Sequence, residues 1–196
     1  MTTPDTIFLD RDGVINEDSE NYITSRDALR FIPGSLDAIV RLTRAGCRVI
    51  VITNQSAVGR GMMPVSELDA IHARLRQAVD RRGGRITDIF YCPHRPDEGC
   101  RCRKPEPGLI FAACDRYAID LTRAVMVGDS AKDILAGQAA GCGRTVLVLT
   151  GNGQSAGKSL AAEGRYPDHI AADLGRAVDW LLDRSGRRNP GGPPAP

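Results

Sequence analysis

Two aspartates and a glycine follow a short apolar run near the start of the chain. Asp10, Asp12 and Gly13 come directly after residues 7–9. Alternate side chains of a strand share a face, so both carboxylates should project to one side, about 6–7 Å apart along the backbone. Such a pair can bind a cation, and the glycine permits a sharp turn beside it. A plain surface turn is the alternative. A calcium loop is excluded, because its glycine would stand sixth, whereas here it stands fourth.

A second acidic pair follows another apolar run. Asp129 closes the run that begins at residue 124, and Asp133 falls in the first turn of the helix expected next. Both carboxylates can therefore face one site, although Asp129 could instead cap the helix. If the sheet brings them near Asp10 and Asp12, the concentrated negative charge is costly without a cation. All-oxygen ligands favour Mg²⁺.

Two further residues are suited to binding a phosphate. Thr53 ends a β-branched run before a glycine-containing loop, where its hydroxyl and the following backbone N–H groups could hold an anion. Lys104 lies two residues beyond a cysteine cluster, and Pro105 restricts its backbone. It would supply a fixed positive charge. The alternatives are an ordinary strand threonine and a solvated lysine.

The cysteine cluster has the spacing of a metal site. Cys92, His94, Cys100 and Cys102 place four soft or borderline ligands within eleven residues. They suit a closed, tetrahedral, structural zinc site, and a disulfide is disfavoured in a reducing compartment. The metal would anchor residues 92–104, which carry little core of their own. The other cysteines and histidines lie apart and are expected to be buried, structural or solvated: Cys47, Cys114, Cys142, His72 and His169.

Strand-like and helix-like patterns alternate along the chain. Strands are expected at 7–10, 47–53, 86–91, 124–129, 145–150 and near 169–170, and helices at 36–44, 64–82, 108–117, 130–140 and 174–184. This alternation predicts an α/β fold with a doubly wound, open parallel sheet of the Rossmann-like kind. The site then lies beyond the carboxyl ends of the strands. Residues 151–157 do not fit the dinucleotide-binding fingerprint and are expected to form a flexible loop.

Length and composition limit the organisation and the partners. The chain has 196 residues, of which 42% are hydrophobic and 26% charged, as expected for one globular domain. We expect that domain at residues 1–184 and a disordered tail, rich in Gly, Pro and Arg, at 185–196. A net charge of +2 does not favour nucleic acid or membrane. With no signal peptide or long apolar run, a cytoplasmic location is expected.

In order along the chain, four motifs resemble those of the haloacid dehalogenase superfamily of phosphohydrolases: Asp10-Arg11-Asp12-Gly13, Thr53-Asn54-Gln55, Lys104, and the segment from Gly128 to Asp133. The resemblance implies that Asp10 is a nucleophile forming an aspartyl phosphate and that Asp12 is the acid and base. Thr53 and Lys104 would stabilise the phosphoryl group. Mg²⁺ would be held by Asp10, the backbone carbonyl of Asp12 and Asp129, with Asp133 as outer support. A large cap domain has no room.

Two branches of that superfamily share the zinc loop. Residues 53–61 and the Cys/His loop resemble the D-glycero-D-manno-heptose 1,7-bisphosphate 7-phosphatase family, and the histidinol-phosphatase family carries a similar loop. A sugar bisphosphate has a second anion, for which Arg60, Arg101 and Arg103 are suited. Histidinol phosphate has an amine, for which Asp97 and Glu98 are suited. The resemblance implies substrate contacts at Arg11, Asp18, Asn21, Asn54, Gln55, Ser56 and Arg103.

The expected activity is therefore Mg²⁺-dependent removal of the 7-phosphate from a small phosphorylated sugar, in the synthesis of nucleotide-activated heptose, by a monomer. Histidinol-phosphate hydrolysis is the alternative. A non-catalytic metal-binding module is a remote third possibility, because it would be expected to have lost catalytic positions that are all present here.

Overall fold

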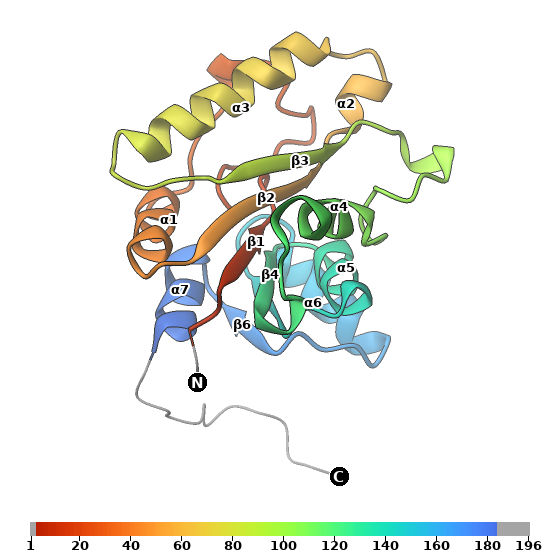
Figure 1. The fold of residues 1–196 in the computed structure, drawn as a ribbon. Helices are drawn as coiled ribbons and strands as arrows, with labels where there is room; N and C mark the ends of the chain where they lie inside the picture. The colour runs from red at the N-terminus through yellow and green to blue at the C-terminus, as the bar shows by residue number, and fades with distance from the viewer. Residues whose placement is uncertain (1–2, 184–196) are drawn as a thin grey trace.

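The computed structural model describes residues 3–183, in which a six-stranded sheet lies between two layers of helices (Figure 1). The strands stand in the order β3-β2-β1-β4-β5-β6, and every neighbouring pair is parallel. Their bounds are β1 Thr6–Leu9, β2 Arg48–Asn54, β3 Asp88–Cys92, β4 Ala124–Gly128, β5 Arg144–Val148 and β6 His169–Ala171. The predicted α/β fold with an open parallel sheet is confirmed.

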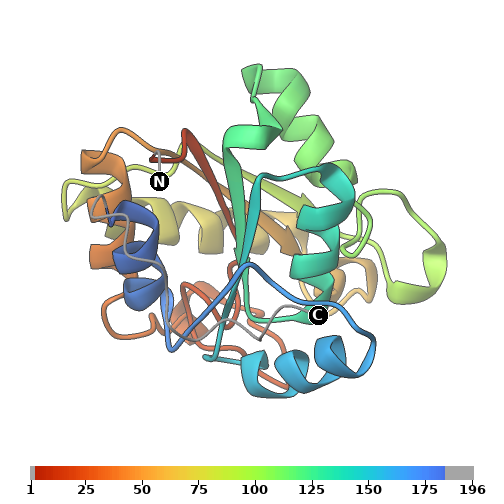
Figure 2. The ribbon, with the colours of Figure 1, turned by 90° about the horizontal axis from the view of Figure 1, so that it is seen from below.

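The helices cover both faces of the sheet, as the view from below shows (Figure 2). One face carries α1 (Ser35–Arg44), α3 (Val65–Asp80) and α7 (Leu174–Leu182), and the other carries α4 (Gly108–Tyr117) and α5 (Ala131–Ala140), with α6 (Gly153–Ala162) beside α5. Strand residues alternate between the two cores. Ile7 and Leu9 join the α1, α3 and α7 side, whereas Phe8 joins the α4 and α5 side. Burial on both faces explains the continuous apolar runs.

Local signals fix the ends of the helix that follows β4. The Ser130 side chain caps α5 by accepting from the backbone N–H of Lys132, and the Asp133 carboxylate accepts from the backbone N–H of Ser130. This reciprocal capping box begins the helix directly after Asp129. Gly141 ends it with a φ of 84°, a conformation that glycine adopts without steric cost. The acidic residues of this segment are therefore held in fixed positions at the edge of the sheet.

The expectation of a flexible loop at residues 151–157 is wrong, because α6 begins at Gly153. Ala156 and Leu160 bury the inner face of α6 against Ile134 and Leu147, and their i, i+4 spacing was the helical signal within the glycine-rich stretch. Likewise, one helical turn, α2 (Ser56–Gly59), lies within the loop expected after β2. The expected tail at 185–196, and residue 184 of the expected last helix, lie outside the described residues.

Two longer connections contain only short 3-10 turns. Residues 10–34 link β1 to α1 and contain η1 (Arg26–Ala28), and residues 93–107 link β3 to α4 and contain η2 (Pro96–Glu98). A third 3-10 turn, η3 (Leu121–Arg123), precedes β4. Between residues 3 and 183, no helix is long and apolar enough to cross a membrane.

Two glycines of α6 should respond oppositely to alanine. A Cβ at Gly153 would lie 1.8 Å from the Val148 carbonyl oxygen, whereas one at Gly157 would lie 3.4 Å from the Leu147 side chain. Gly153→Ala should lower the free energy of unfolding by about 1–3 kcal/mol through overpacking. Gly157→Ala should raise it by about 0.5–1 kcal/mol, because alanine favours a helix. Urea unfolding of both variants measures this, and equal effects would contradict the packing of α6 on β5.

Candidate active site

The carboxyl ends of the central strands open into one cleft of about 320 Å³. Asp10 follows β1, Thr53 lies near the end of β2, and Asp129 follows β4. Lys104 reaches the same place from the connection after β3. The cleft is lined by Asp10, Asp12, Asp18, Ser19, Glu20, Tyr22, Ile23, Thr53, Asn54, Gln55, Ser56, Pro96, Arg103, Lys104, Asp129, Ser130, Lys132, Asp133 and Asn152. The expectation that the polar residues at the strand ends would lie together at this edge of the sheet is confirmed.

Three carboxylates cluster in the cleft, and one ammonium pairs with two of them. Oxygen atoms of Asp10, Asp129 and Asp133 all lie within 4.8 Å of one another. The ammonium of Lys104 lies 2.9 Å from Asp10 and 2.6 Å from Asp133, and it also donates to the Ile52 carbonyl at 2.8 Å. With all three carboxylates ionised, two negative charges would be left without a partner within this group. An all-oxygen set with that excess fits a divalent cation such as Mg²⁺.

The pKa values reflect this crowding. Burial raises the pKa of Asp10 well above its usual range; Lys104 opposes the rise, and the carboxylates of Asp133 and Asp129 add to it. Burial and the charge of Asp133 raise the pKa of Asp129 to about 7. Burial alone would lower the pKa of Lys104, but Asp10 and Asp133 raise it. Lys104 is therefore charged at neutral pH, and a metal would relieve the repulsion among the carboxylates.

Asp129 is enclosed by the loop after β5, which the sequence analysis did not assign to the site. The backbone N–H of Asn152 donates to Asp129 at 2.8 Å, and the Asn152 side chain donates to Asp18 at 3.0 Å. A Cβ at either Gly13 or Gly151 would lie 2.1 Å from Asp129, and both glycines have a positive φ. The sharp turn expected at Gly13 is thus present. Asn152 could have been found by the strand-end rule, because it follows β5 at the same edge.

Asp12 is held away from the three carboxylates by its own set of donors. Asn16 donates to one oxygen and Gln55 to the other, each at 2.8 Å, and the Arg11 guanidinium donates to both. Although burial would raise the pKa of Asp12, Arg11, Asn16 and Gln55 together lower it. Gln55 also donates to the Thr53 hydroxyl at 2.9 Å, which links the two predicted catalytic groups.

Arg11 is an expected substrate contact, but its side chain is enclosed in the core. Arg11 is 0% exposed and does not line the cleft. Its guanidinium pairs with Asp12 and Gln55 and lies 3.4 Å from Nε2 of His72. An arginine with its charge neutralised inside the core orients neighbouring side chains instead of meeting a ligand. Nothing in the sequence separated these two roles, because the burial of Arg11 depends on α3 packing over it.

The other expected substrate contacts divide according to their position. Five of them line the cleft: Asp18, Asn54, Gln55, Ser56 and Arg103. Asn21 does not line it, whereas its neighbour Tyr22 does. Asp97 and Glu98, the residues suited to a substrate amine, are also absent from the lining. Asp97 pairs with the Arg95 guanidinium, and Glu98 accepts from the Arg95 backbone at 2.8 Å.

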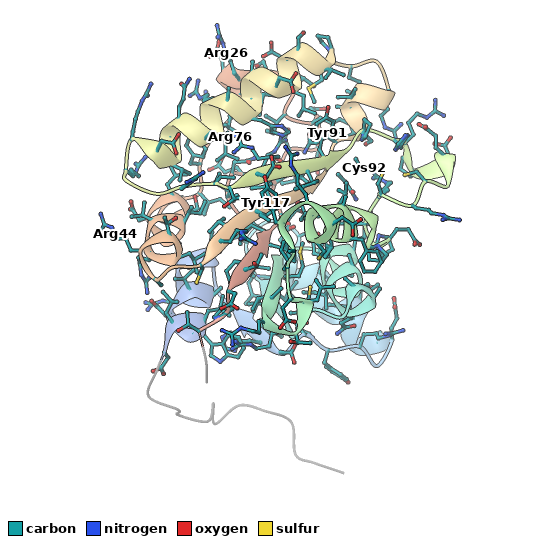
Figure 3. The ribbon with its side chains drawn as sticks, in the orientation of Figure 1. Arg26, Arg44, Arg76, Tyr91, Cys92 and Tyr117 are labelled. Carbon is teal, nitrogen blue, oxygen red and sulfur yellow. The ribbon has the colours of Figure 1, made fainter. Side chains whose placement is uncertain are left out.

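The zinc ligands predicted from the sequence form a compact group in the connection after β3. Figure 3 labels Tyr91 and Cys92 where β3 enters this segment. The Sγ atoms of Cys92, Cys100 and Cys102 lie 3.2–3.6 Å apart, and Nδ1 of His94 lies 3.2 Å from Cys102. Tetrahedral zinc–thiolate bonds would place the sulfurs about 3.8 Å apart. All three cysteines are free thiols, so the geometry fits a structural zinc.

Comparisons with known proteins give a consistent result. The HAD-hydrolase-like family matches residues 101–177. A D-glycero-beta-D-manno-heptose-1,7-bisphosphate 7-phosphatase of Bordetella bronchiseptica is 44% identical over 91% of this chain and 98% of its own length. One from Pseudomonas putida is 51% identical over 76% of this chain and 84% of its own length.

Solved structures agree with these relatives. A crystal structure of the D,D-heptose 1,7-bisphosphate phosphatase from B. bronchiseptica, complexed with magnesium and phosphate, has a TM-score of 0.84 and 43% identity. It covers 90% of this chain and 97% of that one. The corresponding enzyme from Burkholderia thailandensis has a TM-score of 0.68 and 38% identity, with coverage of 91% and 99%.

His72 should make the fold sensitive to mild acid. Burial and the nearby charge of Arg11 lower the pKa of His72 from 6.5 to about 3. Below pH 6.5, His72 therefore binds a proton in the unfolded chain but stays neutral in the folded chain. The free energy of unfolding falls as the pH falls toward 3. Between pH 6.5 and 5 this amounts to about 2 kcal/mol. Urea unfolding at both pH values measures this: between pH 6.5 and 5, the His72→Gln variant should lose about that much less free energy of unfolding than the native chain. If the free energies of unfolding of the two proteins fall in parallel with pH, the protonation of His72 is not the cause.

Proposed function

The chain belongs to the D-glycero-beta-D-manno-heptose-1,7-bisphosphate 7-phosphatase family of haloacid dehalogenase-like hydrolases, and we propose that it removes the 7-phosphate from that sugar bisphosphate. The observation that carries the proposal is the single cleft that gathers Asp10, Asp12, Thr53 and Lys104 beside a second, cationic cleft. We assign the product to the synthesis of nucleotide-activated heptose.

The chemistry proceeds in two displacements at phosphorus. A carboxylate oxygen of Asp10 forms a bond to phosphorus, the bond from phosphorus to the sugar oxygen breaks, and Asp12 gives its proton to the leaving oxygen. Water then attacks the aspartyl phosphate, Asp12 takes a proton from it, and the Asp10 oxygen leaves. The donors around Asp12, which include Asn16 and Gln55, orient it and favour its ionised form, which is the form that takes the proton from water.

Positive charge must balance the transferring group, since most of the catalytic effect in phosphoryl transfer is electrostatic. The ammonium of Lys104, 2.9 Å from Asp10, and the Thr53 hydroxyl are the protein's donors at the phosphoryl oxygens. Asp10, Asp129 and the backbone carbonyl of Asp12 would hold Mg²⁺, with Asp133 as outer support. Mg²⁺ bound there would supply further positive charge to the phosphoryl oxygens.

The second phosphate of the substrate has a matching surface. A neighbouring cleft of about 440 Å³ shares Pro96, Arg103, Lys104 and Lys132 with the first, and Arg101 also lines it. Arg60 lines neither cleft. Lys132 is exposed, and its side chain has no ion pair among residues 3–183. With Asp97 and Glu98 engaged by Arg95, this region favours an anion over the amine of histidinol phosphate.

The cysteines bear on the cellular location of the protein. Free thiols in a zinc-type cluster support a reducing, cytoplasmic location. A monomeric state and the absence of nucleic-acid and membrane partners stay predictions.

The proposal is tested by phosphate release, in the presence of Mg²⁺, from the β and α anomers of heptose 1,7-bisphosphate and from histidinol phosphate. We expect kcat/KM for the β-bisphosphate to exceed that for histidinol phosphate by about a hundredfold or more, near 2.7 kcal/mol. Asp10→Asn should remove turnover without loss of zinc or fold, because the amide is not a nucleophile. Higher activity on histidinol phosphate, or turnover by Asp10→Asn, would overturn the proposal.

Lys132 should matter only when the substrate carries its second phosphate. Lys132→Ala should raise KM for heptose 1,7-bisphosphate by roughly fivefold, about 1 kcal/mol for one partly screened charge. KM for heptose 7-phosphate should not change. Lys158→Ala, which removes an exposed lysine of α6 outside both clefts, is the matched control. An equal rise in KM with both substrates would show that Lys132 does not bind the second phosphate.

A further inference from the structure

The ammonium of Lys104 must be placed accurately, yet Lys104 does not lie in a helix or strand. It lies in the connection between β3 and α4. Its ammonium must nevertheless stay between Asp10 and Asp133, at 2.9 Å and 2.6 Å. Catalytic groups keep such geometry only when neighbouring groups fix them. The backbone of Lys104 must therefore be held by a neighbouring group.

The side chain of Asn54 holds the backbone of Lys104. Its Oδ1 accepts from the backbone N–H of Lys104 at 3.0 Å, and its Nδ2 donates to the Lys104 carbonyl at 3.1 Å. This reciprocal pair copies the exchange of two backbone hydrogen bonds between neighbouring strands. Both the donor and the acceptor function of the Asn54 amide are engaged, so the side chain has a protein partner at each end.

The same strand also holds the other end of Lys104. Asn54 is the last residue of β2, and Ile52, two residues earlier, accepts from the Lys104 ammonium at 2.8 Å. Backbone and ammonium are thus fixed to β2 at two points. Since β2 lies beside β1, which leads into Asp10, these bonds set the ammonium relative to the nucleophile.

Asn54 further connects the two ends of the zinc loop, residues 92–104. Its backbone is in register with Cys92, where the loop begins, and its side chain binds Lys104, where the loop ends. Gln55, the next residue, donates its backbone N–H to the Cys92 carbonyl at 2.7 Å. The base of the loop is therefore closed by β2 independently of the Cys/His cluster.

We infer that Asn54 is a positioning residue that acts on the reaction through Lys104. The inference rests on the proposed phosphatase function only for its kinetic consequence. Because Lys104 meets charge that develops during phosphoryl transfer, a displaced ammonium should cost more in the transition state than in the bound substrate. Loss of the Asn54 amide should therefore lower kcat, with little change in KM.

The test uses the full chain with its metals. Asn54→Ala should lower kcat by tenfold or more, with KM within twofold, zinc content retained, and faster hydrogen exchange in the peptide that contains the Lys104 amide. Asn54→Asp keeps an acceptor for that amide and loses the donor, so its exchange should be intermediate. Gln138→Ala, which loses a comparable 2.9 Å bond to the Tyr166 carbonyl far from the cleft, should leave kcat and this exchange unchanged.

A double-mutant cycle with Lys104→Ala separates positioning from direct substrate binding. Asn54→Ala should have little further effect on kcat when Lys104 is already absent, because residues that act as a unit are not additive. Additive losses, a rise in KM alone, or unchanged exchange at Lys104 in both Asn54 variants would overturn the inference. The exchange result does not depend on the substrate, so inactivity of the native chain on heptose 1,7-bisphosphate would overturn only the proposed function.

Discussion

The site depends on one buried imbalance of charge. Asp10, Asp129 and Asp133 cluster where the central strands end, and a single ammonium, that of Lys104, pairs with Asp10 and Asp133. Burial of carboxylates without compensation is unfavourable, so the cleft has excess affinity for positive charge. This excess explains the fit to a divalent cation, and a cation bound there would offset the negative charge of a phosphoryl group. The parallel sheet makes the imbalance possible, because it brings residues from distant segments to one edge.

The second constraint is the anchoring of a segment that has almost no core. The connection after β3 carries Lys104 and the cationic side of the cleft, yet it contains only one 3-10 turn. The Cys/His cluster anchors its middle, and hydrogen bonds from the end of β2 anchor its base. Strand-like hydrogen bonding, together with zinc ligation at the cluster, would therefore take the place of hydrophobic packing where an open cleft leaves no room for it.

The sequence was informative where spacing determines geometry. The strand ends expected from the sequence correctly predicted that Asp10 and Asp129 lie close together. The Cys/His spacing correctly predicted that the four zinc-type ligands form one cluster. It was uninformative where side-chain direction depends on tertiary packing. Arg11 was expected at the substrate but is enclosed beneath α3, and α6 was missed because its glycines obscured the apolar pair Ala156 and Leu160. The role of Asn16 arises from a turn whose path local patterns do not specify, whereas Asn152 follows β5 and could have been found from its position after a strand.

The proposed chemistry requires that Asp10 carries the phosphoryl group during turnover. The most direct measurement is rapid quenching of the enzyme during turnover of heptose 1,7-bisphosphate, followed by borohydride reduction and peptide mass spectrometry. Reduction converts an aspartyl phosphate into homoserine and so marks the acceptor residue. We expect homoserine at Asp10 and at no other aspartate. Homoserine at another aspartate, or its absence while phosphate is still released, would contradict it.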